Sequence, residues 1–181
     1  MTFSDAPIPL HIPATDVNGG GPVIFSKETS PNMKVSHAVR CSMSIPLLFS
    51  YQVYEQHLLV DGAILSEDAL FRDWQQDGTP NICFRLRSEA REQPFNPKRR
   101  LMLPQYIGML IRTFMTALSR EYVHAEHWHN ALVINTGAAS SVDFDMSCED
   151  KLSLYKQGYE TAMNFLPIKL SKLNSYHSNA V

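Results

Sequence analysis

Short apolar runs alternate along this chain with segments whose apolar residues recur at three- and four-residue steps. The short runs are typical of strands, which we predict at 8–12, 23–25, 57–60, 82–86 and 131–135. The longer steps are typical of helices, which we predict at 33–41, 67–76, 103–122 and 147–166. This alternation of the two kinds of element predicts an α/β fold.

Turn and cap residues set the boundaries of these elements. Asn18–Gly21 is a glycine-rich turn between the first two strands. Ser147 and Asp150 form a helix-capping pair, and Pro167 is expected to end that last helix. One face of this helix is marked by apolar residues: Leu152, Tyr155, Tyr159, Met163 and Leu166. We therefore expect one domain at 1–170, with a polar surface loop at 88–100, and a loose polar tail at 171–181.

Composition narrows the class of protein. Hydrophobic residues make up 44% of the chain, which is enough for a globular core. The formal net charge of -2 gives no general attraction to nucleic acid, so we predict no nucleic-acid partner. The three cysteines are far apart and form no C-x-x-C pair, which is typical of a reducing, cytoplasmic compartment.

Targeting and membrane signals are weak in the sequence. The first residues carry no basic stretch followed by an apolar one, so they do not resemble a signal peptide. The most apolar long stretch, at 101–118, is interrupted by Pro104, Gln105 and Arg112 and falls short of a membrane span. We expect a cytoplasmic protein that contacts a membrane, if at all, from its surface.

Asp61 is the strongest candidate for chemistry because it follows the predicted strand 57–60 and precedes Gly62 and Ala63. Aspartate and glycine are common in turns, so a plain turn is one interpretation. The other is a carboxylate displayed at the carboxyl edge of a parallel sheet, where open α/β folds bind ligands. Apolar neighbours would raise the pKa of such a carboxyl group and make it a better base.

Four segments place this aspartate in a wider pattern: HIPATD at 11–16, GPVIFS at 21–26, AVRCSMSIP at 38–46 and LVDGA at 59–63. In this order and spacing they resemble the second half of the patatin-like phospholipase domain. The resemblance implies a lipid acyl hydrolase that cleaves phospholipid or glycolipid esters by a Ser–Asp dyad without a cofactor. In that family the aspartate of the Asp-Gly-Gly/Ala motif accepts the proton of the serine, so the resemblance assigns this role to Asp61.

The nucleophile of such an enzyme is missing from the sequence, which contains no Gly-x-Ser-x-Gly. Ser42 and Ser44 lack the flanking glycines that expose a nucleophilic serine, so neither is a good replacement. We expect the C-terminal part of the domain: a partial patatin-like sheet flanked by helices, without the strand that leads to the nucleophile. The chain is then a fragment, a truncated product or a subunit completed by another polypeptide.

Two consequences follow from the missing nucleophile. A catalytically inactive remnant that binds lipid or a protein partner is the alternative function. A sheet cut before its central strand would expose an apolar edge, so we also expect self-association through that edge.

Two other clusters have plain interpretations. His124, His127 and His129 lack the His-Glu-x-x-His spacing of a zinc site, so a solvated helix end is favoured and no metal is predicted. The basic residues at 98–100 precede the amphipathic helix 103–122. We favour a helix that covers the sheet with its charges in water, and a helix that lies on a membrane surface remains the alternative.

Overall fold

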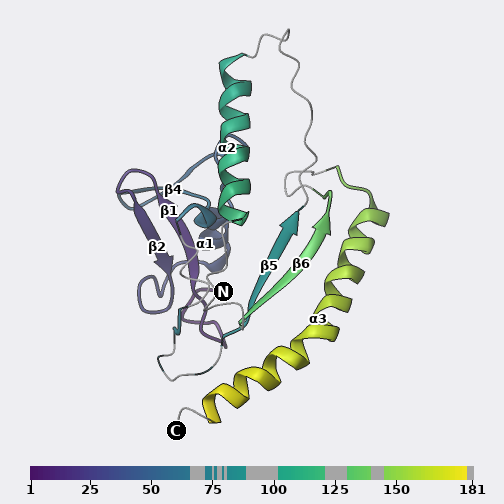
Figure 1. Ribbon diagram of the computed structural model, residues 1–181. Coiled ribbons are helices and arrows are strands. Elements are labelled where there is room, and N and C mark those ends of the chain that lie inside the picture. Colours follow the sequence, from purple (N-terminus) through teal and green to yellow (C-terminus); the bar gives the residue numbers. More distant parts are fainter. Residues whose placement is uncertain are drawn as a thin grey trace. The chain divides into compact units, whose positions relative to one another are not determined.

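The computed structural model describes residues 1–65, 72–74, 76, 79, 81–88, 102–120, 130–139 and 145–178 (Figure 1). It confirms the α/β class. The chain divides into two compact units, each described by itself. The first unit consists of Met1–Leu70 with Leu101–Leu118, and the second of Phe71–Arg100 with Ser119–Val181.

The first unit is built on a four-stranded antiparallel sheet with the strand order β2-β1-β4-β3. Its strands are β1 (Ile12–Asp16), β2 (Gly21–Phe25), β3 (Gln52–Tyr54) and β4 (His57–Val60). The predicted strand at 57–60 is confirmed. The first strand lies later than the predicted 8–12, because the residues from Ile12 onward are those that pair with the neighbouring strand β2.

The predicted glycine turn joins β1 to β2 as a hairpin in which Asp16 pairs with Gly21. Gly20 has a φ of 71°, a left-handed conformation that glycine adopts without steric cost. Its amide donates to the carbonyl oxygen of Asp16 at 2.8 Å, which closes the turn. The turn therefore fixes the register of the two strands.

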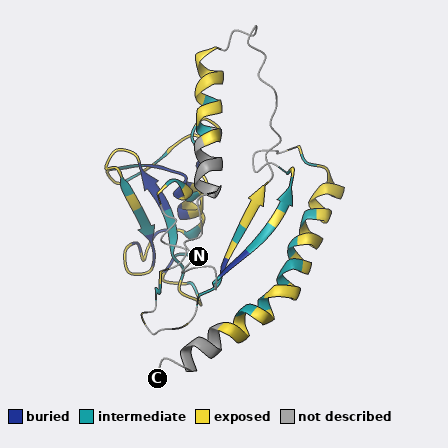
Figure 2. Cartoon of the chain, viewed as in Figure 1, coloured by how far each residue is buried: buried dark blue, intermediate teal, exposed yellow. Residues whose placement is uncertain are grey.

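The core of the first unit lies between this sheet and the helix α1 (Val35–Ser42), which begins two residues later than the predicted helix at 33–41. Figure 2 shows buried positions on β1, on β4 and on α1. The buried cluster consists of Phe3, Ala14, Phe25, Met33, Ala38, Cys41 and Leu59. Tyr54 from β3 packs edge-on against Phe25 with ring centroids 5.5 Å apart, which closes the cluster at its rim.

The long predicted helix is observed as α2 (Leu103–Arg120), and the two residues predicted beyond it lie outside the described part of the chain. The expectation that its apolar face covers the sheet is not met at residues 103–110, and the side chains at 114–122 lie outside the described part. Leu103, Tyr106, Ile107 and Leu110 are exposed, because no described strand packs along them. Among the described residues, no helix combines the length and the apolar character needed to cross a membrane.

The second unit pairs β5 (Cys83–Ser88) with β6 (Ala131–Gly137) in parallel, and helix α3 (Cys148–Ser178) packs along β6. The apolar run that predicted the strand at 82–86 is buried only at Cys83. Phe84 is 52% exposed and Leu86 is 65% exposed. Alternate residues of a strand share one face, so these two side chains form an open apolar face of β5.

The cap of α3 is confirmed. The Ser147 hydroxyl oxygen accepts a hydrogen bond from the Asp150 amide at 3.1 Å, and the same hydroxyl donates to the Asp150 carboxylate at 2.6 Å. The predicted end at Pro167 is wrong, because the helix continues to Ser178 and includes most of the expected loose tail. Proline removes one helical hydrogen bond and crowds the carbonyl four residues earlier, yet the helix continues beyond it through Ile168, Lys169 and Leu170.

The packing face of α3 also differs from the prediction. One face of this helix was expected to be marked by Leu152, Tyr155, Tyr159, Met163 and Leu166. Leu166 is half-buried, but the other four are exposed, as Figure 2 shows for much of this helix. The half-buried positions are Leu154, Gly158, Thr161, Ala162, Leu166 and Lys169. Small residues among them allow a helix to approach its neighbour closely.

Three sequence predictions fall wholly or partly outside the described residues. The predicted helix at 67–76 is not helical at residues 72–74 and 76, and the rest of it is not described. The predicted loop at 88–100 is described only at Ser88, which ends β5. The three histidines at 124, 127 and 129 also lie outside the described part.

Candidate functional site

Asp61 is the first residue after β4 and caps the short 3-10 helix η1 (Gly62–Ile64). Its environment differs from the predicted edge of a parallel sheet, because β4 pairs antiparallel with both β1 and β3. The reason is topological: β3 and β4 are joined by a tight turn, which only antiparallel neighbours permit. The aspartate is nonetheless buried, with 9% of its surface exposed.

The two oxygens of the Asp61 carboxylate have different surroundings. Oδ1 accepts a hydrogen bond from the amide of Ala63 at 2.8 Å, as in an N-cap. The backbone amide of Asp61 donates to the carbonyl oxygen of Ser44 at 3.0 Å, which holds the residue from the other side. Within the described residues no group donates a hydrogen bond to Oδ2. One oxygen is therefore anchored and the other is available as an acceptor.

Burial raises the pKa of the Asp61 carboxyl group above its ordinary value of 3.8, and the hydrogen bond from Ala63 opposes this rise. No cation contributes to the shift, so removal from water is the dominant effect. A carboxylate with a raised pKa binds a proton more readily. The local structure of Asp61 thus favours the work of a general base.

Gly62 is required by a close approach of the backbone. A Cβ atom at this position would lie 2.3 Å from the carbonyl oxygen of Pro13 and 2.7 Å from its carbonyl carbon. Both atoms belong to β1, so they cannot swing aside as a flexible side chain would. Ala63, in contrast, is exposed. The turn therefore demands glycine directly after the aspartate and accepts a methyl group at the next position.

Ser44 supports Asp61 and is not exposed as a nucleophile. Its side chain is fully buried, and its hydroxyl donates to the carbonyl oxygen of Arg40 at 2.6 Å. This bond ties the segment after α1 back to the helix, while the Ser44 carbonyl receives the Asp61 amide. Ser42 ends α1 and is half-buried. Neither serine sits on the strand-to-helix turn that presents a nucleophile.

Part of the chain, including the site, matches a known protein family. Residues 2–70 match the family model of patatin-like phospholipases. The matched segment, called the patatin-like region below, contains Asp61, Gly62 and Ala63. It lies in the N-terminal part of this chain, so the expectation of a domain at 1–170 extends well beyond the match.

Two further similarities cover more of the chain. It is 27% identical over 165 residues to an uncharacterized protein of Acanthamoeba polyphaga mimivirus, and the alignment covers 88% of this chain and 55% of that protein. The chain thus spans about half the length of this relative. The crystal structure of VipD from Legionella pneumophila superimposes with a TM-score of 0.59 at 16% identity, covering 93% of this chain and 35% of VipD. That likeness shows the fold.

A second buried carboxylate in the patatin-like region was not singled out from the sequence. Asp16 Oδ2 lies 2.7 Å from Nδ1 of His57, and Oδ1 accepts from the amides of Asn18 at 3.0 Å and Leu58 at 3.2 Å. The bond to His57 is the main reason why the pKa of Asp16 is lowered to about 2. This pair joins the end of β1 to the start of β4, the strand that leads to Asp61.

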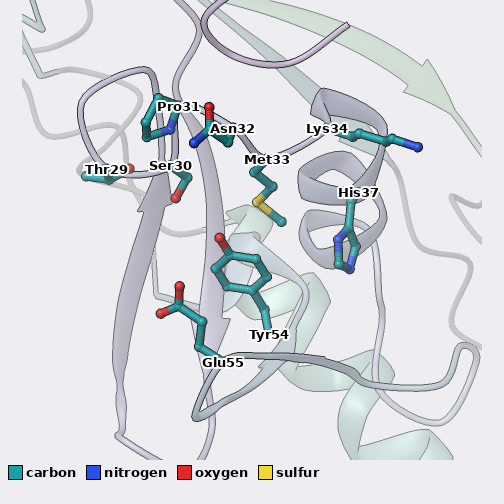
Figure 3. Close-up of a pocket in the computed structure, with 9 residues that line it drawn as sticks. All are labelled: Thr29, Ser30, Pro31, Asn32, Met33, Lys34, His37, Tyr54 and Glu55. Carbon is teal, nitrogen blue, oxygen red and sulfur yellow. The ribbon is translucent and has the colours of Figure 1, made fainter.

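A hollow of about 450 Å³ lies elsewhere in the patatin-like region (Figure 3). It is lined by Thr29, Ser30, Pro31, Asn32, Met33, Lys34, His37, Tyr54 and Glu55. Neither Asp61 nor the residues bonded to it take part. In Figure 3 the Lys34 side chain points away from the other lining residues, so the basic and acidic groups do not converge on one ligand position. The hollow therefore adds nothing to the chemistry of Asp61.

Metal binding was weighed from the sequence and has no candidate in the part of the chain that the structure describes, where no three metal-ligating side chains gather. The residues that make up the candidate site are therefore Asp61, its anchors Ala63 and Ser44, and the obligatory Gly62.

Proposed function

We propose that Asp61 is the proton acceptor of a Ser–Asp dyad in a lipid acyl hydrolase of the patatin-like type. In this proposal the chain corresponds to the later part of the family's domain and supplies the aspartate. The serine and the groups that stabilise the oxyanion come from residues outside these 181. The observation that carries the proposal is the buried carboxylate with one anchored and one free oxygen, inside the matched region.

The chemistry follows from that arrangement. The serine hydroxyl attacks the acyl carbonyl of a phospholipid or glycolipid ester while its proton passes to Oδ2 of Asp61. The protonated carboxyl group then returns the proton to the departing alkoxide as the ester bond breaks. A water molecule cleaves the acyl-serine in the same way, with Asp61 again as base. The bond from Ala63 to Oδ1 keeps the carboxylate oriented throughout these steps.

A catalytically inactive remnant that binds lipid or a protein partner is the second candidate. Its supporting observation is the sequence itself, which lacks Gly-x-Ser-x-Gly. Covalent labelling by a fluorophosphonate separates the two functions, because this reagent reacts with an activated serine. Labelling of the natural gene product at a defined serine contradicts the remnant, whereas absence of both labelling and ester turnover contradicts the enzyme.

Replacement of the base tests the enzyme directly. In the longest natural product that contains these residues, Asp61→Asn is expected to lower kcat for a fluorogenic phospholipid by roughly 10²–10⁴-fold, because the amide cannot accept the proton. The matched control is Glu55→Gln, an equal loss of charge in the β3–β4 turn, which should leave kcat unchanged. Unchanged turnover by the Asp61 variant contradicts the proposed role.

The raised pKa of Asp61 adds a pH signature to the same assay. Only the ionised carboxylate accepts a proton, so kcat/KM should fall as pH drops through a value above the ordinary 3.8. Stability depends on pH in the opposite direction from activity. Because the folded-state pKa is raised, the contribution of Asp61 to stability is greatest below pH 3.8 and is lost as pH rises through the raised value. Asp61→Asn should therefore unfold at or above the wild-type temperature at pH 7.

A further inference from the structure

The four-stranded sheet of the patatin-like region is made of two hairpins, β1–β2 and β3–β4. Two residue pairs and one further backbone bond join them: Thr15 with Val60, Asp16 with Leu59, and the Val17 amide with the Leu58 carbonyl. Among the described strands β3 pairs only with β4, so it adds nothing to this junction. The position of the β3–β4 hairpin therefore rests on a short backbone ladder and on the side chains that reinforce it.

The Asp16 carboxylate bridges the two hairpins at this junction. On the first hairpin it accepts a hydrogen bond from the amide of Asn18 at 3.0 Å. On the second it accepts one from the amide of Leu58 at 3.2 Å and lies 2.7 Å from Nδ1 of His57. An ionised carboxylate only accepts hydrogen bonds, so Nδ1 of His57 carries the proton and donates it. Hydrogen bonds to an ionised acceptor are stronger than those between neutral groups.

Gly19, in the turn of the first hairpin, gives this carboxylate its space. A Cβ atom at Gly19 would lie 2.5 Å from Oδ2 of Asp16, the oxygen that meets His57. A Cβ atom at Gly21, two residues later, would have no atom within 4 Å. The left-handed residue of this turn is Gly20, so the backbone accepts alanine at both of its neighbours. The close approach at Gly19 therefore matters for the carboxylate and not for the turn itself.

Asp61 depends on the same junction, because it is the first residue after β4. The Asp16 carboxylate holds the start of β4, and Gly62 lies against the Pro13 carbonyl of β1 just beyond its end. Both contacts fix the second hairpin to the first. A shift of β4 along β1 would carry Asp61 with it, and a slip of one residue would exchange the two faces of the strand.

We propose that Asp16 and His57 are positioning residues for the base: their hydrogen bond holds the β3–β4 hairpin in the register that places Asp61 for proton transfer. This inference rests on the proposed function, in which Asp61 accepts the proton of the serine. It deepens that function by giving a part in it to two residues that act only through β4. Because the pKa of Asp16 is lowered to about 2, its carboxylate stays ionised while Asp61, whose pKa is raised, takes up and releases protons.

A matched pair of variants at His57 tests the hydrogen bond. His57→Leu removes the donor, whereas His57→Asn has nearly the same shape and keeps an N–H at the place of Nδ1. Both should fold, because 42% of the His57 side chain is exposed. In the full 181-residue chain, ¹³C NMR follows the titration of the Asp61 carboxyl group. His57→Leu should lower the pKa of Asp61 toward 3.8, because a looser β4 admits water to a group whose pKa is raised by burial.

His57→Asn should titrate like the wild-type chain. A second matched pair leaves both positioning residues in place. Gly19→Ala should lower the pKa of Asp61 as His57→Leu does, because its methyl group displaces Oδ2 of Asp16. Gly21→Ala adds the same methyl group to open space and should leave the titration unchanged.

Catalysis provides the second measurement. In the longest natural product that contains these residues, His57→Leu should lower kcat for a fluorogenic phospholipid roughly tenfold or more and leave KM nearly unchanged. The fall of kcat/KM at acid pH should move to lower pH together with the pKa of Asp61. A purely structural role would reduce the amount of folded enzyme without moving this pH profile.

Two results overturn the positioning role. One is a titration of Asp61 that is the same in His57→Leu as in His57→Asn. The other is an equal shift of that titration in Gly19→Ala and Gly21→Ala. The NMR measurement also separates this inference from the proposed function. If the titration shifts as expected and the natural product cleaves no ester, the coupling of Asp16 and His57 to Asp61 is confirmed and the hydrolase is contradicted.

Discussion

Asp16 at the end of β1 and Asp61 just after β4 are both buried carboxylates, yet their pKa values move in opposite directions. His57 and backbone amides surround Asp16 and lower its pKa to about 2, whereas Asp61 receives one amide and is dominated by burial. The two pKa shifts differ in direction because the two carboxylates have different hydrogen-bond partners. Asp16 is equipped to stay ionised and hold two strands together, while Asp61 keeps an oxygen free to take a proton.

The contribution of Asp16 to stability should therefore depend on pH in a defined way. Its folded pKa of about 2 lies below the ordinary 3.8, so its stabilising effect is present above pH 3.8 and is lost as pH falls through about 2. Asp16→Asn should lower the unfolding temperature by several degrees at pH 5, and the gap to wild type should close near pH 2. Circular dichroism melts across this range measure the gap.

Asp5→Asn is the control for that series. The pKa of Asp5 is also lowered, mainly by bonds from Thr2, but its side chain is exposed and lies near the N-terminus. Its substitution should shift the melts little at any pH. A constant gap for Asp16→Asn between pH 5 and pH 2 would contradict the role assigned to the ionised Asp16 carboxylate.

At the scale of elements, the close contact between η1 and β1 fixes the position of Asp61. Gly62→Ala should lower the free energy of unfolding by about 1–3 kcal/mol, because its new methyl group meets the Pro13 carbonyl and the turn must move. Chemical denaturation measures this loss. Gly21→Ala is the control, since no atom lies within 4 Å of the added Cβ. Equal stability of the two variants would contradict the close approach.

The elements of the site were largely predictable, and the pairings between them were not. Strand 57–60 and the turn after it follow from a short apolar run that ends at Asp61-Gly62. The hydrogen bond between Asp16 and His57 joins residues 41 positions apart, so no local sequence pattern predicts it. The antiparallel sheet was missed for the same reason, because strand order depends on contacts that propensity does not encode.

Helix α3 shows a second limit of local rules. Pro167 is a helix-ending signal, yet this helix passes through it. Four of the five apolar residues expected on one face of this helix are exposed, whereas Leu154, Gly158, Thr161 and Ala162 are half-buried. Apolar periodicity identified the helix but did not identify which of its residues are covered.

At the scale of the whole molecule, the open apolar face of β5 has a consequence for assembly. Phe84 and Leu86 are exposed on a strand whose described part pairs only with β6. Such a face and edge favour pairing with another chain. The sedimentation coefficient of the isolated chain should therefore rise with protein concentration.

A double substitution Phe84→Ser with Leu86→Ser should reduce this rise, because it removes the apolar face. Val53→Ser is the control, an equally exposed apolar position on β3 in the other unit, and should leave association unchanged. A concentration-independent monomer in wild type would contradict the prediction.

Each unit contains one buried cysteine, so the rate at which that thiol reacts reports how often the unit opens. Cys41 is buried in the core of the first unit, where burial also raises its thiol pKa, and Cys83 is buried at the start of β5 in the second. Cys148 is exposed. A thiol reagent should modify Cys148 at once and reach the other two only when the surrounding unit opens. The order in which Cys41 and Cys83 react therefore records which unit opens first.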